Sequence, residues 1–156
     1  MVIPLVSFGQ LTINKHPGYS KMNYDEKGVV FAVEKINNGI IISNFIIKEN
    51  DDWSFTYLDN KEYIENQINS KEYENTLKSF YPNSNIIMKT DFYFKSVGNV
   101  FLIVYSYKEG QINLINTIFQ FIKNNKLYTA TGSSVRNSYR QNFDEYKTMI
   151  DSIEFY

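Results

Sequence analysis

Apolar and polar residues alternate along the first half of the chain with the period of two that is typical of β-strands. In residues 29–35 the alternation places three apolar side chains on one face of a strand. Asn37-Asn38-Gly39 follows directly, and Asn and Gly tolerate the positive φ angles of a tight hairpin turn. The pattern therefore predicts a hairpin here, preceded by a short strand at residues 11–14.

Two segments are apolar on both faces, which predicts central strands that are covered on both sides. These are residues 40–47, directly after the hairpin turn, and residues 100–107. Short turns separate the second segment from strand-like stretches at residues 86–95, 112–122 and 127–131. The second half of the chain therefore predicts a meander of four antiparallel strands.

The period changes to that of an amphipathic helix in two places. Asp59 and Glu62 have the spacing of a capping box, and an apolar stripe runs on through Phe80. Asn142 and Glu145 have the same spacing before a last set of apolar residues at steps of three and four. Each of these patterns predicts a helix.

The order of the predicted elements is three strands, a helix, four strands and a helix. Strands that are apolar on both faces need a layer of structure on each side of their sheet. The fold class is therefore α+β, with one large, mostly antiparallel sheet flanked by two main helices. A length of 156 residues, 43% of them hydrophobic, is that of a single domain with a core of ordinary size.

The chain opens with MVIPLVSFGQ, an apolar run that ends in small residues and then turns polar. Ser7 and Gly9 stand at the −3 and −1 positions of a cleavage site before Gln10. The stretch resembles the end of signal peptides of Bacteroidetes-type bacteria. We expect residues 1–9 to be a signal-peptide remnant and residues 10–156 to be the domain, in the periplasm or cell envelope. The alternative is a first β-strand at residues 2–6 of a cytoplasmic protein.

Composition excludes several kinds of chemistry. The chain has no cysteine and a single histidine, His16, so disulfides, thiolate metal sites, a histidine zinc cluster and a Ser-His-Asp triad are not expected. A formal net charge of −1 does not favour nucleic acid as a partner. Glu49, Asp51 and Asp52 form one acidic spot without the spacing of a calcium loop. We expect no cofactor, no metal, no catalytic residue and no transmembrane segment.

Both arginines of the chain fall in one polar segment, residues 132–141, which we expect to be a loop. Arg136, Tyr139 and Arg140 precede the predicted last helix and form the candidate partner-binding loop. Arginines beside a helix N-terminus can bind an anion or a partner's carboxylate. The alternative is a solvated connection whose arginines pair with acidic residues on the surface.

The end of the chain resembles the PsbP/DcrB-like fold family. The resemblance rests on a strand at residues 127–131, a helix start reading Phe143-Asp144-Glu145-Tyr146, and apolar spacing into a terminal element at residues 150–155. It implies an α/β sandwich over residues 10–156. It also implies a non-enzymatic protein, because members of this family mostly bind partners. Phe143 and Tyr146 are expected to be core anchors.

These observations favour a non-enzymatic, exported binding or accessory protein that acts through a protein or envelope partner. A cytoplasmic chaperone or immunity partner of a secreted effector is the alternative, and it requires the first residues to be a true strand. A small enzyme or ligand carrier with a pocket between sheet and helix ranks third, since no nucleophile–base pair can be named.

Overall fold

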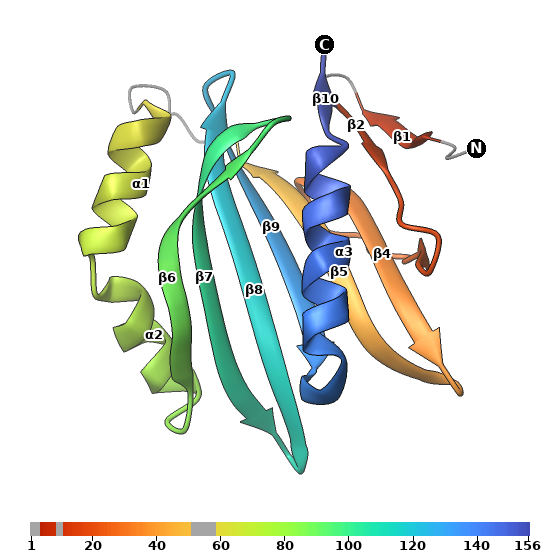
Figure 1. Cartoon of the computed structure of the whole chain (residues 1–156), viewed down its shortest axis with the longest axis vertical. Helices are drawn as coiled ribbons and strands as arrows, with labels where there is room; N and C mark the ends of the chain where they lie inside the picture. Colours follow the sequence, from red (N-terminus) through yellow and green to blue (C-terminus); the bar gives the residue numbers. More distant parts are fainter. Residues whose placement is uncertain (1–3, 9–10, 51–58) are drawn as a thin grey trace.

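A computed structural model describes residues 4–8, 11–50 and 59–156 (Figure 1). Its main sheet has seven antiparallel strands in the order β3-β4-β5-β9-β8-β7-β6. The strands are β3 (Ser20–Lys21), β4 (Val29–Asn37), β5 (Ile40–Asn50), β6 (Asn85–Phe94), β7 (Gly98–Glu109), β8 (Ile112–Lys123) and β9 (Lys126–Val135). A smaller sheet joins β1 (Pro4–Phe8), β2 (Leu11–Asn14) and β10 (Glu154–Phe155).

Three α-helices lie against the main sheet. They are α1 (Asn60–Asn69), α2 (Glu72–Phe80) and α3 (Tyr139–Asp151), and a short 3-10 helix, η2 (Arg136–Ser138), leads into α3. Helix α3 covers one face of the sheet, and α1 and α2 cover part of the other (Figure 1). The predicted α+β class and antiparallel sheet are confirmed, but one of the two predicted main helices is a pair of shorter helices.

The predicted turns and the meander are confirmed. Asn38 and Gly39 have positive φ angles of 51° and 76° and join β4 to β5. Asn124 and Asn125 also have positive φ and join β8 to β9. Strands β6, β7, β8 and β9 pair in sequence order, each antiparallel to the next. These elements form where the local sequence already specifies the turn.

Strand β7 is buried on both faces, as predicted, because helices pack on each side of it. Leu102 and Val104 point into the larger core on the α3 side, and Phe101 and Ile103 point into the smaller core under α1 and α2. The side chains of these four residues are fully buried.

The same prediction is wrong for β5. Phe45 and Ile47 are buried on the α3 side, but Ile40 and Ile41 are 65% and 50% exposed. The reason is lateral position, since α1 packs on β6, β7 and β8 and not over the hairpin end of β5.

The first helical segment begins as predicted. The side chain of Asp59 accepts a hydrogen bond of 2.8 Å from the backbone N–H of Glu62. Ser70 ends α1, and its hydroxyl accepts a hydrogen bond from the N–H of Glu72 at the start of α2. The prediction for Phe80 is wrong, because its side chain is 73% exposed.

The predicted loop at residues 132–141 is wrong. Strand β9 continues to Val135 and α3 begins at Tyr139, so only a short 3-10 turn separates them. Asn142 and Glu145 are buried inside α3 and do not form its cap. Their side chains bind groups on β9 and β4 instead, which fixes the helix on the sheet.

Strand β1 pairs antiparallel with β2, and β2 pairs on its other side with β10 at the end of the chain. Part of the segment predicted to be a signal remnant therefore forms a strand of the small sheet. Cleavage before Gln10 stays a prediction.

Candidate functional site

The side of α3 that faces the sheet carries a closed network of polar side chains. Lys35 of β4 donates hydrogen bonds from Nζ to Asn142 Oδ1 at 2.9 Å and to Glu145 Oε2 at 2.5 Å. Asn142 donates from Nδ2 to Ser134 Oγ at 2.7 Å, and Gln141 donates from Nε2 to Glu145 Oε1 at 3.0 Å. The first turns of α3 are thereby bonded to both β4 and β9.

Glu145 is ionised in this network. Burial raises the pKa of its carboxyl, but the hydrogen bonds from Lys35 and Gln141 and the charge of Lys35 outweigh burial and hold that pKa below its usual range. The carboxylate and the ammonium are both almost fully buried, so each depends on the other for charge compensation.

A second part of the network surrounds the hydroxyl of Tyr146. Ser43 Oγ lies 2.6 Å from that hydroxyl and 2.9 Å from the hydroxyl of Tyr19, and Tyr146 donates to the carbonyl of Ser133. Burial raises the pKa values of the Tyr146 and Tyr19 phenols well above the ordinary value for tyrosine, so both side chains are neutral at physiological pH.

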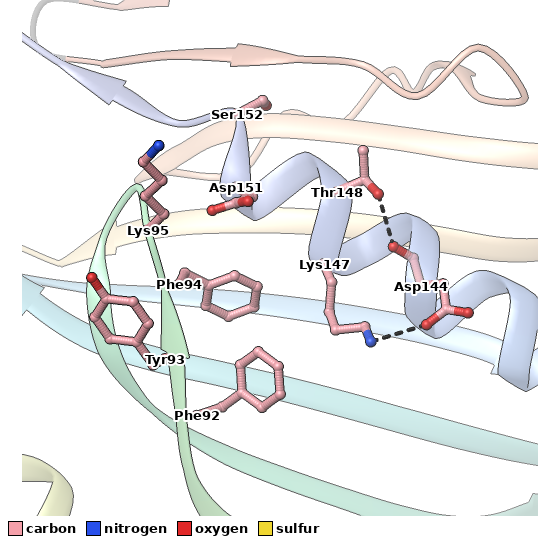
Figure 2. Close-up of a pocket in the computed structure, with 9 residues that line it drawn as sticks. All are labelled: Phe92, Tyr93, Phe94, Lys95, Asp144, Lys147, Thr148, Asp151 and Ser152. Carbon is pink, nitrogen blue, oxygen red and sulfur yellow. Dashed lines mark hydrogen bonds and ion pairs between the residues drawn. The ribbon is translucent and has the colours of Figure 1, made fainter.

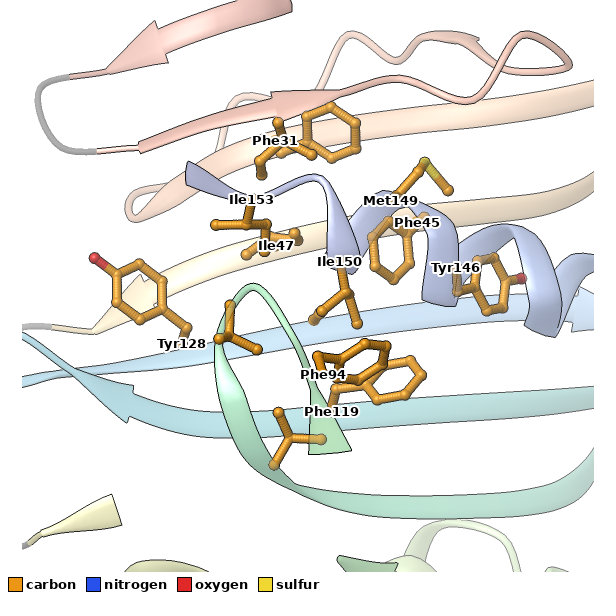
Figure 3. Packing of buried hydrophobic residues seen from close by; sticks show 14 of the residues in the cluster. Phe31, Phe45, Ile47, Phe94, Phe119, Tyr128, Tyr146, Met149, Ile150 and Ile153 are labelled. Carbon is orange, nitrogen blue, oxygen red and sulfur yellow. The ribbon is translucent and has the colours of Figure 1, made fainter. Parts of the chain in front are cut away.

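Gly132 makes the position of the Tyr146 ring possible. A Cβ atom at Gly132 would lie 2.3 Å from the ring, far inside van der Waals contact. The ring also stacks on Phe45, the β5 residue that pairs with Gly132, with 5.1 Å between ring centroids (Figure 3). These contacts confirm Tyr146 as a core anchor. This side of α3 therefore holds the fold together and leaves no open site.

The outer side of α3 and the turn before it carry exposed charged side chains in place of buried ones. Arg136 lies in η2 and Arg140 in the first turn of α3, and both are exposed. Within the described residues neither arginine forms a salt bridge, so the pairing with surface acids that the alternative required is not found there. The first turn of α3 also contains no acidic residue.

Tyr139 does not lie on the exposed surface with the two arginines. Its side chain is half-buried, and its ring packs against Phe143 with 5.6 Å between centroids. Burial raises the pKa of its phenol. Of the three residues predicted to form the binding loop, the structure leaves the two arginines on the surface and places the tyrosine at the rim of the core.

A groove of about 580 Å³ lies further along α3, between this helix and the hairpin that joins β6 to β7 (Figure 2). Its walls combine aromatic and charged side chains: Phe92, Tyr93, Phe94, Lys95, Asp144, Lys147, Thr148, Asp151 and Ser152. Lys147 Nζ lies 4.8 Å from the centroid of the Phe143 ring and 3.0 Å from the carboxylate of Asp144. The groove therefore offers ring faces, two ammonium groups and two carboxylates to a ligand.

The end of the groove is fixed by hydrogen bonds from the hairpin turn. Ser96 donates from Oγ to the carbonyl of Ile150 at 2.8 Å, and its N–H donates to Asp151 Oδ1 at 3.3 Å. The hairpin is thus tied to the last turn of α3, which makes the groove a preformed feature.

No local pattern in the sequence predicts this groove. Its two walls lie about 50 residues apart in the chain, and the run Phe92-Tyr93-Phe94 looks like any strand with alternating burial.

The histidine and the acidic residues considered in the sequence analysis make local contacts or lie outside the described residues. Among the described residues no cluster of three or more acidic or histidine side chains could hold a metal ion. His16 accepts a hydrogen bond from the N–H of Gly18 within its own turn. Glu49 forms a salt bridge with Lys126 at 2.8 Å, while Asp51 and Asp52 lie outside the described residues. No helix in the described part is long and apolar enough to cross a membrane.

Several solved structures resemble the chain over most of its length. LpqN of Mycobacterium tuberculosis, involved in cell envelope biogenesis, superposes with a TM-score of 0.62 at 5% identity, over 93% of this chain and 82% of its own. CyanoP, the cyanobacterial PsbP of Synechocystis, superposes at 0.56 with 11% identity, over 94% and 86%. The Ran-binding protein Mog1p of Saccharomyces cerevisiae superposes at 0.54 with 8% identity, over 94% and 90%.

The chain has the PsbP/Mog1-like fold. The predicted resemblance is thereby confirmed at the level of the fold. A protein from Bacteroides thetaiotaomicron has the same architecture at a TM-score of 0.54 and 12% identity, and the chain spans 45% of its length. No protein-family model and no curated protein matches the sequence.

Proposed function

We propose that the protein is a non-enzymatic binding or accessory protein, and that a protein partner binds along the outer side of α3. The observation that carries the proposal is the pair Arg136 and Arg140, both exposed and without salt bridges in the described residues. Arg136 lies in η2 and Arg140 in the first turn of α3, the helix that forms one wall of the groove. One turn of helix separates Arg140 from Asp144, where the groove begins.

The chemistry of this surface favours a partner segment that is acidic at one end and apolar or aromatic at the other. Guanidinium groups bind carboxylates through paired hydrogen bonds, and arginine is enriched where proteins bind each other. The ring of Phe92 offers contact area for an apolar side chain in the groove (Figure 2). Proteins that share the fold support the proposal, since Mog1p is a Ran-binding protein.

We further propose that the protein is exported and acts in the periplasm or cell envelope. The signal-like opening of the chain supports this location, and so does the shared fold of LpqN, a protein of cell envelope biogenesis.

One observation favours the second candidate, a cytoplasmic chaperone or immunity partner. Strand β1 pairs with β2, as expected if the first residues are part of the working fold. Cell fractionation of the native protein, with intact mass to find its first residue, separates the two. An envelope protein that begins at Gln10 supports export, and a cytoplasmic protein that retains residues 4–8 supports the chaperone.

The binding surface itself is tested by photo-crosslinking in the cells that make the protein. A photoreactive amino acid replaces Thr148 or Arg140 on the proposed surface, and Lys61 serves as the matched control because it is exposed on α1, across the sheet. The proposal expects one partner band from the first two positions and none from Lys61. Equal labelling from all three positions, or from Lys61 alone, would refute the proposed surface.

A further inference from the structure

Strand β6 is a long edge of the main sheet. The strand at the other end, β3, has two residues, whereas β6 has ten, and within the described ranges it pairs with β7 along one side only. A free edge presents unpaired N–H and C=O groups that can bind another strand. The edge is also apolar in places, since Ile87, Met88 and Tyr93 are 52%, 41% and 66% exposed.

The usual protection of such an edge is weak here. An exposed lysine discourages strand addition, but the lysine of β6, Lys89, turns under the helices, where it binds the carbonyl of Ser70 and the carboxylate of Glu74. Its side chain is only 14% exposed. A bulge interrupts the strand between Ile86 and Met88, and the rest of β6 pairs with β7 without further irregularity.

The pairing with β7 shows which side chains of β6 share a face. Met88, Thr90 and Phe92 lie opposite Val104, Leu102 and Val100, whose side chains belong to the core on the α3 side. Lys89 and Asp91 lie opposite Ile103 and Phe101, which belong to the core under α1 and α2. Residues of odd and even number in this part of β6 therefore point to opposite faces of the sheet.

This alternation restricts how two copies of β6 could pair. A two-fold axis perpendicular to the sheet keeps each side chain on its own face, so one residue must lie opposite its own copy. With Asp91 at the axis, two carboxylates would face each other, and with Lys89 at the axis two ammonium groups would do so. Like charges in directly opposed positions are destabilising.

With Thr90 at the axis, the pairs next to it are complementary. Lys89 lies opposite Asp91 of the second copy, Met88 lies opposite Phe92, and the two Thr90 side chains face each other. Opposite charges, apolar pairs and threonine pairs all stabilise antiparallel strands. Two N–H groups of Lys89 bind Ser70 and Glu74, which leaves the third N–H of the ammonium for the incoming carboxylate.

We propose that β6 is a homodimer interface, in which a second copy of the chain adds antiparallel to β6 about a two-fold axis at Thr90. The two seven-stranded sheets become continuous through this interface. The inference goes beyond the binding role proposed above, since its occupant is a second copy of this chain and its main surface is the edge of β6. Phe92 belongs to both surfaces, whereas Arg136 of η2 and Arg140 of α3 take no part in the pairing.

The absence of cysteine makes the register directly measurable. The Thr90→Cys variant has a single thiol, which the proposed register places opposite its own copy, about 5 Å away between Cβ atoms. The Asp91→Cys variant is the matched control, because its thiols would lie in diagonal positions about 7–8 Å apart, too far for an unstrained disulfide. Both positions are on the strand surface, so neither substitution removes a buried group.

The experiment is mild oxidation of both variants, with sedimentation analysis of the unmodified chain over a concentration series. The proposal expects a concentration-dependent dimer and rapid disulfide formation by Thr90→Cys but not by Asp91→Cys. It also expects Asp91→Lys to sediment as a monomer, since a lysine there faces Lys89. A monomer at all concentrations, a dimer in which Thr90→Cys does not crosslink, or faster crosslinking by Asp91→Cys would each overturn it.

Discussion

The two sides of α3 differ in almost every physical property. On the inner side, Asn142, Glu145 and Tyr146 are buried, and their polar groups are bonded to β4, β5 and β9. On the outer side, Arg136 and Arg140 are exposed and form no salt bridge within the part of the chain that the structure describes. One short stretch of sequence thus carries both the buried polar groups that bind the helix to the sheet and two exposed arginines without a salt bridge in the described residues.

This difference separates the groups that hold the fold from those available for binding. A buried polar network must be complete, because each unpaired member costs free energy. An exposed arginine without a partner costs little in water and keeps its donors free for another molecule. Substitutions on the inner side should therefore change stability, and substitutions on the outer side should change binding alone.

The largest effect is expected at Gly132, where β9 contacts α3. In Gly132→Ala, the new Cβ would lie 2.3 Å from the Tyr146 ring, which is fully buried and cannot move without breaking its hydrogen bonds. We expect a loss of about 3 kcal/mol in the free energy of unfolding, measured by urea denaturation.

Gly18→Ala is the matched control for that substitution. A Cβ at Gly18 would meet its nearest atom, Cε of Lys35, at 3.4 Å, and the free energy of unfolding should change by less than about 1 kcal/mol. Adding Tyr146→Ala to Gly132→Ala should cost less than the sum of the single changes, because the clash is gone. Additive losses would mean that the ring and the glycine do not contact each other.

A smaller, pH-dependent effect is expected at Glu145. The Glu145→Gln variant leaves Lys35 buried without its counter-charge, which should cost about 2 kcal/mol at pH 7. The pKa of Glu145 is lowered from 4.5 in the folded protein, so its ionisation stabilises the fold above that pH, and this contribution is lost as the pH falls below it.

The measurement is urea unfolding of both proteins between pH 7 and pH 3. The difference in unfolding free energy between the native protein and Glu145→Gln should stay constant down to about pH 5 and then shrink. A difference that is the same at pH 3 and pH 7 would show that the charge of Glu145 does not hold the helix.

Local sequence patterns predicted the elements whose cause is local. Asn38-Gly39 specifies a turn by itself, Asp59 caps its helix through a residue three positions away, and the run at residues 100–107 is apolar on both faces. For the turn and the cap the energetic reason lies within a few residues of the chain. The burial of residues 100–107 also needs the helices that cover the two faces of β7.

The start of α3 could not be predicted in this way. Asn142 and Glu145 have the spacing of a capping box, but their side chains bind elsewhere. Asn142 binds Ser134 on β9, and Glu145 binds Lys35, which is more than 100 residues away in the chain. Residues 132–135 look like a loop because they are small and polar, yet β5 and β8 pair with them on both sides. Tertiary contacts decided these positions against the local preference.

The most direct test compares stability and binding in one variant, Arg136→Ala/Arg140→Ala, with the photoreactive residue at Thr148, which lines the groove on α3. We expect the free energy of unfolding to change by less than about 0.5 kcal/mol, because both arginines are exposed and form no salt bridge in the described residues. We expect the partner crosslink to fall at least about tenfold, as the loss of two charge-assisted contacts predicts. An unchanged crosslink, or a loss of stability as large as that of Gly132→Ala, would contradict the assignment of folding to one side of α3 and binding to the other.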